Sequence, residues 1–478
     1  MPSIHLSLLT PQDLEQIHQT SFKILRQVGI IVHHPGVLLR LGEGGARIDP
    51  VKKTARFDEE LVMSAVAQAG KQFIIHGRDP QKIARFGYGD FNLMSSPGQY
   101  SWFDWRTGMR REPVLADAIA AVQVGEALAN VSICGAMSVP SDVPLPVRDV
   151  VTFAAMAKVC SKPLRVWPVS RRSSHYLLEI CAAIAGGKQA LRENPLVETF
   201  LEPISPLQLP ETGLDVVLEF LDYGQPVSFG PMVMAGGSGP VTLAGTLAQE
   251  NAEILAGITT VQILAPGTPV MYGGIPHIMD PRTSICSFGS PEQGLMALAM
   301  TEIGKSYVLP VYINVNLSDA KTLDAQAGME KMSGLLLGML AGADLYGHGG
   351  ILGTDHGGSL PWLVVDNEAF NYARRVVRGF SINEETLALP VIEMVGPAGN
   401  YLAETHTVKH LRQEIWAPNR LWTRQAYDPW LESGATEIGQ RASTEVDRIL
   451  EQHPGETIDP VLSREIDLIV EAAKKELL

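Results

Sequence analysis

The chain has 478 residues, of which 45% are hydrophobic, and a formal net charge of −14. A protein this negative repels phosphate backbones, so we do not expect nucleic acid as a partner. No basic segment followed by an apolar run opens the sequence, and Pro and Gly interrupt its two long uncharged stretches, residues 223–249 and 254–279. We therefore expect a cytoplasmic protein without membrane spans.

The four cysteines show neither CxxC spacing nor a paired framework: Cys134, Cys160, Cys181 and Cys286. This usage is typical of buried, reduced thiols in a cytosolic protein. It indicates neither a disulfide scaffold nor a zinc site.

The first 90 residues predict an N-terminal α+β cap. Residues 10–28 carry helical periodicity, with Thr10 as N-cap and Pro11 at the first helical position. A short helix over residues 59–69 and a strand over 72–76 follow, without a repeating pattern.

From residue 91 to residue 380, short apolar runs alternate with helical stretches, which predicts βα units around a parallel sheet. Eight runs qualify as strands, the number that a closed TIM (β/α)8 barrel needs. They span residues 91–97, 131–137, 163–169, 197–207, 226–235, 269–275, 310–316 and 345–352. The clearest helices between them span residues 115–129, 147–160, 174–185, 241–262 and 324–341.

Residues 381–478 predict a helical C-terminal extension packed on the barrel, with helices over 443–453 and 463–478. Trp416, Trp422 and Trp430 lie in a loop-rich stretch before these helices. We expect them to anchor the extension rather than to contact a ligand.

Residues 229–253, FGPMVMAGGSGPVTLAGTLAQENAE, resemble the central signature of the trimethylamine methyltransferase family. Three further segments agree with that family: PGTPVMYG at 266–273, SDAKTLDAQAG at 318–328 and THTVKHLR at 405–412. Because these segments span the chain from barrel to extension, the resemblance covers nearly its full length.

The resemblance implies a TIM barrel that binds a small substrate at its C-terminal mouth, where a separate corrinoid protein presents the cobalt of its cobalamin. A homo-oligomer is also expected. Family members that act on trimethylamine carry pyrrolysine near the strand that here spans residues 310–316, whereas this chain has only standard residues there. This difference disfavours trimethylamine and favours a quaternary amine, with glycine betaine as the first choice. Proline betaine, carnitine and butyrobetaine remain alternatives, as does a non-catalytic betaine-binding protein.

A quaternary ammonium group suits such a barrel because it leaves as a neutral tertiary amine and needs no general acid. The protein then has to position and desolvate the cation, so we assign no catalytic residue from sequence. A lyase or aldolase barrel is the other enzyme class considered, but the predicted strands contain no Lys for a Schiff base.

Aromatic faces recognise such cations, and aromatic residues cluster near the predicted strand ends. Alternation along a strand turns half of them away from the barrel interior. The wider set includes Trp105 and Tyr312, and the predicted substrate-binding aromatics are Tyr100, Trp102, Phe229, Tyr272 and Tyr346.

For the carboxylate of a betaine, we expect His348 and His356 in the Gly-rich loop after the eighth strand to act as donors. Glu202, in the fourth strand, is a candidate to face the cation. A structural role is an equal alternative for all three residues. No metal site is expected, because His-x7-His with one Asp lacks the close pairing of zinc motifs.

Overall fold

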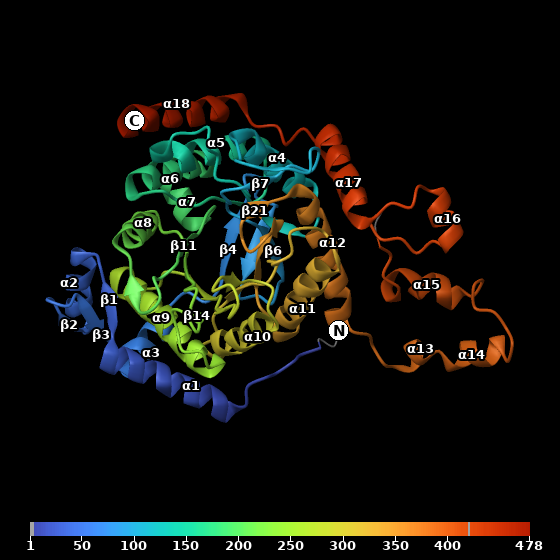
Figure 1. Ribbon diagram of the computed structural model, residues 1–478, viewed down its shortest axis with the longest axis horizontal. Coiled ribbons are helices and arrows are strands. Elements are labelled where there is room, and N and C mark those ends of the chain that lie inside the picture. The colour runs from blue at the N-terminus through green and yellow to red at the C-terminus, as the bar shows by residue number, and fades with distance from the viewer. Residues whose placement is uncertain (1–3, 419–420) are drawn as a thin grey trace.

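A computed structural model describes residues 4–418 and 421–478. Eight parallel strands curl around a common axis, and a helix follows each strand on the outside (Figure 1). The strands are β6 (Asn92–Ser95), β9 (Val131–Gly135), β10 (Leu164–Arg165), β11 (Thr199–Leu201), β13 (Val227–Phe229), β15 (Val270–Gly274), β18 (Val311–Asn314) and β19 (Leu345–Gly349). Each lies within one predicted run, so the predicted barrel architecture is confirmed.

The outer layer consists of one principal helix for each strand. Each helix runs from the mouth of the barrel, at the carboxyl ends of the strands, back to the base at their amino ends. These helices are α4 (Leu115–Ala127), α5 (Arg148–Val159), α6 (Arg171–Ala185), α8 (Glu211–Asp222), α9 (Leu243–Leu264), α10 (Pro291–Ser306), α11 (Ala325–Ala341) and α12 (Leu360–Arg378). A short helix, α7 (Lys188–Glu193), follows α6.

The barrel sheet is not closed by backbone hydrogen bonds all the way round. Its strand order is β10-β9-β6-β19-β18-β15-β13-β11, and within the described chain no ladder joins β10 to β11. Arg165 at the end of β10 instead forms an ion pair with Glu198, just before β11, at 3.0 Å. Both side chains are at least 94% buried, so this pair bridges the seam inside the protein.

The N-terminal cap covers the outside of α9. It comprises α1 (Pro11–Lys23), a π-helical turn (Ile24–Val28), β1 (Ile30–Val32), α2 (Pro35–Glu43), β2 (Arg47–Asp49), β3 (Thr54–Arg56) and α3 (Glu59–Gln68). The predicted cap of Thr10 on α1 is present as a capping box with Asp13. Because α1, α2 and α3 all pack on α9, that helix is buried on every side from Thr246 to Gln262, which explains its apolar sequence.

A hairpin of β4 (Phe73–His76) and β5 (Ile83–Phe86) closes the base of the barrel. Its Phe73 and Phe86 pack in one cluster with Met94, Met271 and Leu345 from the barrel strands. The hairpin also spans the seam, because the His76 N–H donates to the residue-195 carbonyl and the Asp79 N–H to the residue-161 carbonyl. The barrel is therefore plugged at one end.

Loops after the strands build two small sheets over the mouth. One contains β7 (Trp102–Phe103), β8 (Arg110–Arg111), β20 (Ile351–Leu352) and β21 (Gly357–Gly358). The other contains β14 (Met234–Ala235), β16 (His277–Met279) and β17 (Cys286–Ser287). A further short strand from the fourth loop, β12 (Gln208–Leu209), joins β1 of the cap.

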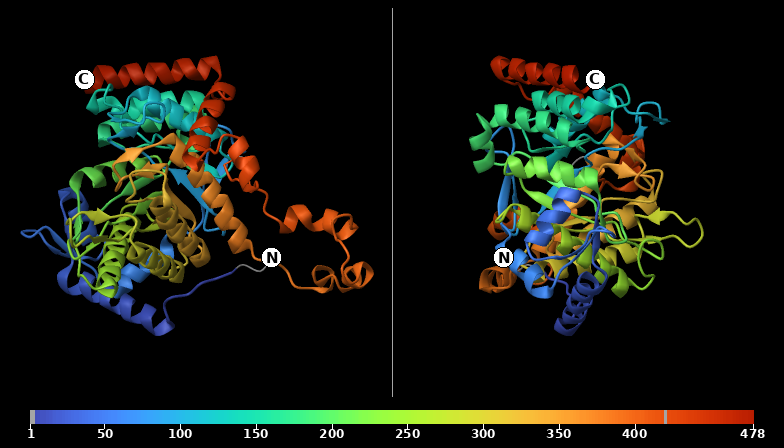
Figure 2. Two further views of the ribbon diagram at one scale, coloured as in Figure 1. Left: turned by 45° about the vertical axis from the view of Figure 1, so that its right-hand side comes forward. Right: turned by 90° about the vertical axis from the view of Figure 1, so that its left-hand side faces the viewer.

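The C-terminal extension divides into two parts. Its elements are α13 (Glu384–Leu387), α14 (Leu389–Val395), α15 (Thr405–Glu414), α16 (Tyr427–Glu432), α17 (Ile438–Gln452) and α18 (Pro460–Leu477). Helices α17 and α18 pack on barrel helices, whereas α13 to α16 project away from the body (Figure 2). The expectation that the whole extension packs on the barrel is therefore wrong for helices α13 to α16, which bury no side chain.

Two of the three tryptophans anchor the extension as predicted. Trp416 and Trp422 pack on Tyr372 of α12, with ring centroids 5.3 and 5.7 Å away. Trp430 packs on Tyr427, which also belongs to the extension, so this contact does not anchor the extension to the barrel. Among residues 4–418 and 421–478, no helix combines the length and apolar character of a membrane span.

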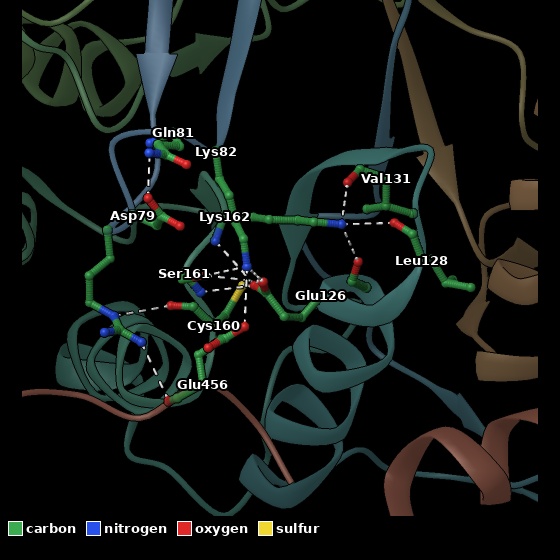
Figure 3. Close-up of polar contacts among 12 residues, drawn as sticks. Asp79, Gln81, Lys82, Glu126, Leu128, Val131, Cys160, Ser161, Lys162 and Glu456 are labelled. Carbon is green, nitrogen blue, oxygen red and sulfur yellow. Dashed lines mark hydrogen bonds and ion pairs between the residues drawn. The ribbon is translucent and has the colours of Figure 1, made fainter. Parts of the chain in front are cut away.

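A polar network at the base joins the hairpin, the barrel and the extension (Figure 3). The Glu126 carboxylate accepts hydrogen bonds from the Lys82 ammonium and from the Ser161 N–H, the latter at 2.9 Å. Burial alone would raise the pKa of this carboxyl, but the hydrogen bonds outweigh it and lower the pKa to about 2. Lys162 donates beside it to the carbonyls of Gly125 and Leu128 at the end of α4, the latter at 2.8 Å, and to that of Val131 at the start of β9.

Replacing Glu126 with Gln should lower the free energy of unfolding by about 2 kcal/mol at pH 7, because Lys82 loses a charged acceptor. The carboxyl has a depressed pKa in the folded state, so its contribution is complete above pH 4.5 and disappears as the pH falls toward 2. Urea unfolding of both proteins at pH 7 and pH 3 measures this. The exposed Glu43 serves as a control, and an equal loss in Glu43→Gln would contradict the prediction.

Candidate functional site

The barrel interior presents two aromatic rings near the mouth. Phe200 of β11 and Tyr312 of β18 meet edge to face, with centroids 5.2 Å apart. Trp167, beyond β10, meets Phe200 at 6.5 Å in the same manner. Tyr312 belonged to the wider set of predicted aromatics, whereas Phe200 was missed.

Three of the predicted aromatics face outward instead. Phe229 packs against α9, and the Tyr272 hydroxyl donates to the Asn251 side chain of that helix at 2.9 Å. The Tyr346 hydroxyl donates to the Ala343 carbonyl at 2.8 Å. These side chains lie between the sheet and the helices, so the prediction that Phe229, Tyr272 and Tyr346 line the substrate site is wrong.

Two carboxyl groups lie in the mouth. Glu202, which follows β11, is exposed, yet the surrounding protein and the nearby charge of Asp355 raise the pKa of its carboxyl to about 7. Burial raises the pKa of Asp355 to about 7 as well, and Gln99 donates to that carboxylate at 2.7 Å. The structure thus places the predicted Glu202 in the mouth and adds Asp355, which sequence reasoning did not assign.

Arg165 supplies positive charge to the same region. Its guanidinium lies over the Phe200 ring, 5.3 Å from the centroid, and its Nη1 makes the ion pair with Glu198. No described residue hydrogen-bonds its Nε or Nη2, which leaves two donor groups for a ligand. The positive charge lowers the pKa of Glu202 and opposes the effect of burial there.

His348 lies at the end of β19 with a left-handed backbone, φ 51°. Its Nδ1 is 2.9 Å from the Tyr312 hydroxyl and 2.6 Å from Asn314 Oδ1. Burial, together with Arg165 and His277, lowers the pKa of this imidazole to about 3, so it is neutral at pH 7. Nδ1 thus contacts two side chains of β18, whereas Nε2 has no hydrogen-bond partner among the described residues.

A second buried histidine, His277 of β16, was missed by sequence reasoning. Its ring lies 4.4 Å from that of Phe288 between centroids, and burial lowers its pKa to about 4. Neither ring nitrogen makes a well-formed hydrogen bond within the described part of the chain, and the Ser287 backbone lies nearby. It packs under the mouth sheets as a neutral group.

The remaining predicted residues lie around the opening. Tyr100, 80% exposed, and His356 line a cavity of about 430 Å3 together with Asp355. Trp102 is fully buried in β7, and its indole N–H has no hydrogen-bond partner in the described structure. The cavity therefore joins the mouth carboxyl to two of the predicted residues, while Trp102 supports the sheet above it.

A larger cavity, of about 720 Å3, lies at the other end of the barrel beside Phe91 and Arg378, far from these groups. In residues 4–418 and 421–478, no three His, Cys, Asp or Glu side chains converge as metal ligands do.

The structure is thus a (β/α)8 barrel with a plugged base and a charged, aromatic site at the carboxyl ends of its strands, where barrel enzymes carry their active sites. The sequence profile of the trimethylamine methyltransferase (MTTB) family matches residues 2–477. The chain belongs to this family of methyltransferases.

Its relatives include proteins named for different substrates. A glycine betaine methyltransferase of Desulfitobacterium hafniense is 31% identical over 474 residues, covering 98% of each chain. The trimethylamine methyltransferase MttB of Methanosarcina barkeri is 30% identical over 488 residues, covering 99% of this chain and 96% of its own. The crystal structure of the Methanosarcina barkeri monomethylamine methyltransferase MtmB superposes with a TM-score of 0.55 at 13% identity, over 94% of this chain and 89% of that one, which shows the shared fold.

Replacing Phe200 with Leu should weaken the binding of an organic cation by about 1–2 kcal/mol, a five- to thirty-fold loss, because the aromatic face is removed while an apolar side chain remains. Phe229→Leu makes the same change on the outward side and should leave affinity unaltered. Calorimetric titration with tetramethylammonium compares the two. Equal affinities for the two variants would mean that Phe200 does not contact the cation.

Affinity for a cation should also rise with pH across the range around 7. Glu202 and Asp355 carry raised pKa values, and a bound cation favours their ionised forms, so protons are released on binding. Titrations at pH 6, 7 and 8 measure the trend, and Glu202→Gln should flatten it. A pH-independent affinity in the wild type would contradict the assignment of these carboxyls to the site.

Proposed function

We propose that this methyltransferase moves a methyl group from a quaternary amine, with glycine betaine as the first choice, to the cobalt of cobalamin held by a separate corrinoid protein. The observation that carries the proposal is the meeting of carboxyl groups and aromatic faces in the barrel mouth. Glu202 and Asp355 offer negative charge there, and the partly exposed Phe200 offers a ring face that the buried Tyr312 supports edge to face. A quaternary ammonium has no N–H to donate, so it depends on these two kinds of contact.

Arg165 and His348 suit the carboxylate end of a betaine. The Arg165 guanidinium has two unused donor groups, and a guanidinium binds carboxylates well. Donation to the same carboxylate needs the imidazole proton on Nε2, so Nδ1 must accept, and the Asn314 side-chain amide must then present its NH2 group to Nδ1 in place of Oδ1. We propose this orientation of the Asn314 amide together with the role of His348 as a donor, and we add Arg165 beside it.

The part of the reaction that this chain performs falls to the residues of the fourth loop and of the two mouth sheets. Methyl transfer breaks a C–N bond whose electron pair stays on nitrogen, so the product is a neutral tertiary amine and no proton has to be supplied. The residues therefore orient the donor and exclude water. When presented at the mouth, the corrinoid supplies the nucleophile that accepts the methyl group. The cavity of about 430 Å3, lined by Asp355 and His356, lies at that end of the barrel.

The choice of a quaternary over a tertiary amine is supported by β18 and its flanks. Residues 310–316 read PVYINVN, all standard amino acids, and Tyr312 and Asn314 point to His348. A tertiary amine needs activation before its methyl group can leave, and the family members that act on trimethylamine carry pyrrolysine near this strand. Sequence identity does not separate the substrates, since the relatives named for each are 31% and 30% identical.

The proposal predicts methyl transfer from glycine betaine and none from trimethylamine. Purified protein is mixed with a reduced cobalamin source and each amine in turn, and the methylcobalamin spectrum is followed together with the amine product. Dimethylglycine should form from glycine betaine. Comparable rates with both amines would refute the quaternary preference, and binding of glycine betaine without any transfer would favour the betaine-binding alternative.

The same assay tests the carboxylate end. His348→Ala should lower the rate with glycine betaine by about ten- to a hundred-fold, the loss of a charged hydrogen bond of about 1.5–3 kcal/mol. Tetramethylammonium lacks a carboxylate, so its rate should change little. Equal losses with the two substrates would assign His348 a structural role.

A further inference from the structure

Residues 380–437, here called the arm, have almost no core of their own. In the described part of this segment, only Leu421 is buried. Helices α13, α14, α15 and α16 bury no residue, and short isolated helices are marginal in water. The arm therefore needs contacts beyond those that its own chain provides.

The arm is also unusually apolar on its surface. Of the thirty-five large hydrophobic side chains that are exposed in the described chain, thirteen lie in this segment. Their exposed fractions run from 44% at Tyr401 to 82% at Leu402. Monomeric proteins scatter such residues singly, so a concentration of this kind marks an interaction surface.

The arm leaves the body at the base of the barrel and rejoins it at the mouth end, where Ile438 at the start of α17 lies beside Leu323 and Asp324 before α11. Helix α12 ends at the base with Arg378, and the cavity beside it is lined by Gly89 and Phe91, just before β6, and by Arg412 and Trp416 of the arm. In the right-hand view of Figure 2, the arm lies on the opposite side of the barrel from the β16–β17 hairpin. A protein docked at the mouth would not cover it.

We propose that the arm embraces a second copy of this chain, so that the protein assembles through exchanged arms. A side chain such as Leu, Val or Phe presents about 60–120 Å2 of apolar surface. Thirteen of them, exposed by half to four-fifths, offer on the order of 800 Å2, the area that each partner contributes to a stable complex. If the partner is a second copy of this chain, a two-fold axis relates the two copies, so each copy buries the arm of the other.

The body supplies a receiving strip at the base of the barrel. Ile4, Leu6 and Leu8 are 40–47% exposed. The Ile4 N–H donates to the Val377 carbonyl of α12 at 3.3 Å, and the Leu6 N–H donates to the Leu340 carbonyl of α11 at 3.1 Å. This apolar strip lies beside the root of the arm, where the arm of a second copy can lie across it.

The test uses the full chain and measures its mass in solution by size-exclusion chromatography with light scattering. The chain alone is 51.8 kDa, so the wild type should elute at twice that mass or a higher multiple. The double substitution Leu402→Glu with Val408→Glu should reduce the mass at least twofold, to that of the monomer. Val51→Glu, at a 91% exposed position in the cap, is the matched control and should leave the mass unchanged.

Circular dichroism and trypsin digestion show whether the arm variant still folds. The barrel should unfold cooperatively as in the wild type, while cleavage at Lys409, Arg412 or Arg424 in the arm should become faster. A monomeric wild type, or an arm variant with the wild-type mass, would overturn the proposal. A monomer whose arm becomes protected only when the corrinoid protein is added would assign the arm to that partner instead. None of these readouts depends on methyl transfer, so this proposal and the proposed function fail separately.

Discussion

The buried ion pair of Arg165 and Glu198 holds together the part of the barrel that backbone hydrogen bonds leave open. Removal of one partner from such a pair costs about 3–5 kcal/mol, because the other charge stays buried without compensation. The pair closes the seam toward the mouth, and the β4–β5 hairpin spans it at the base. The same guanidinium lies over Phe200 and acts on Glu202, so the seam and the site share one charge.

Because Arg165 serves both the seam and the site, its charge explains why several ionisable groups can lie together in the barrel mouth. Arg165 favours the ionised form of Glu202, and it favours the neutral form of His348. Glu202 and Asp355 disfavour each other's negative charge, so the mouth can gain further negative charge when a cation enters. The site is therefore matched to a ligand that brings a positive charge of its own.

The sequence predicted the barrel well because each strand lies in an apolar run that Pro or Gly bounds. It did not predict which side chains face inward, since a shift of one residue exchanges the two faces of a strand. Phe229 was predicted to face the substrate, but its ring packs outward against Gly257 on α9. Arg165 was missed because a single charge in an apolar run has no partner until the fold brings Glu198 beside it. The projecting arm was missed because its pattern is that of any amphipathic tail, and such a pattern does not say whether a helix packs on its own barrel.

The plug formed by the β4–β5 hairpin gives the barrel one entrance. Anything that enters the hollow has to leave by the way it came. If the methyl acceptor docks over the mouth, it blocks the path of the small molecule beneath it for as long as it stays. The amine would then have to bind before the acceptor arrives, and its demethylated product could leave only after the acceptor departs. A barrel with one entrance thus imposes an order of binding and release, and the residence time of the acceptor sets an upper limit on the frequency of turnover.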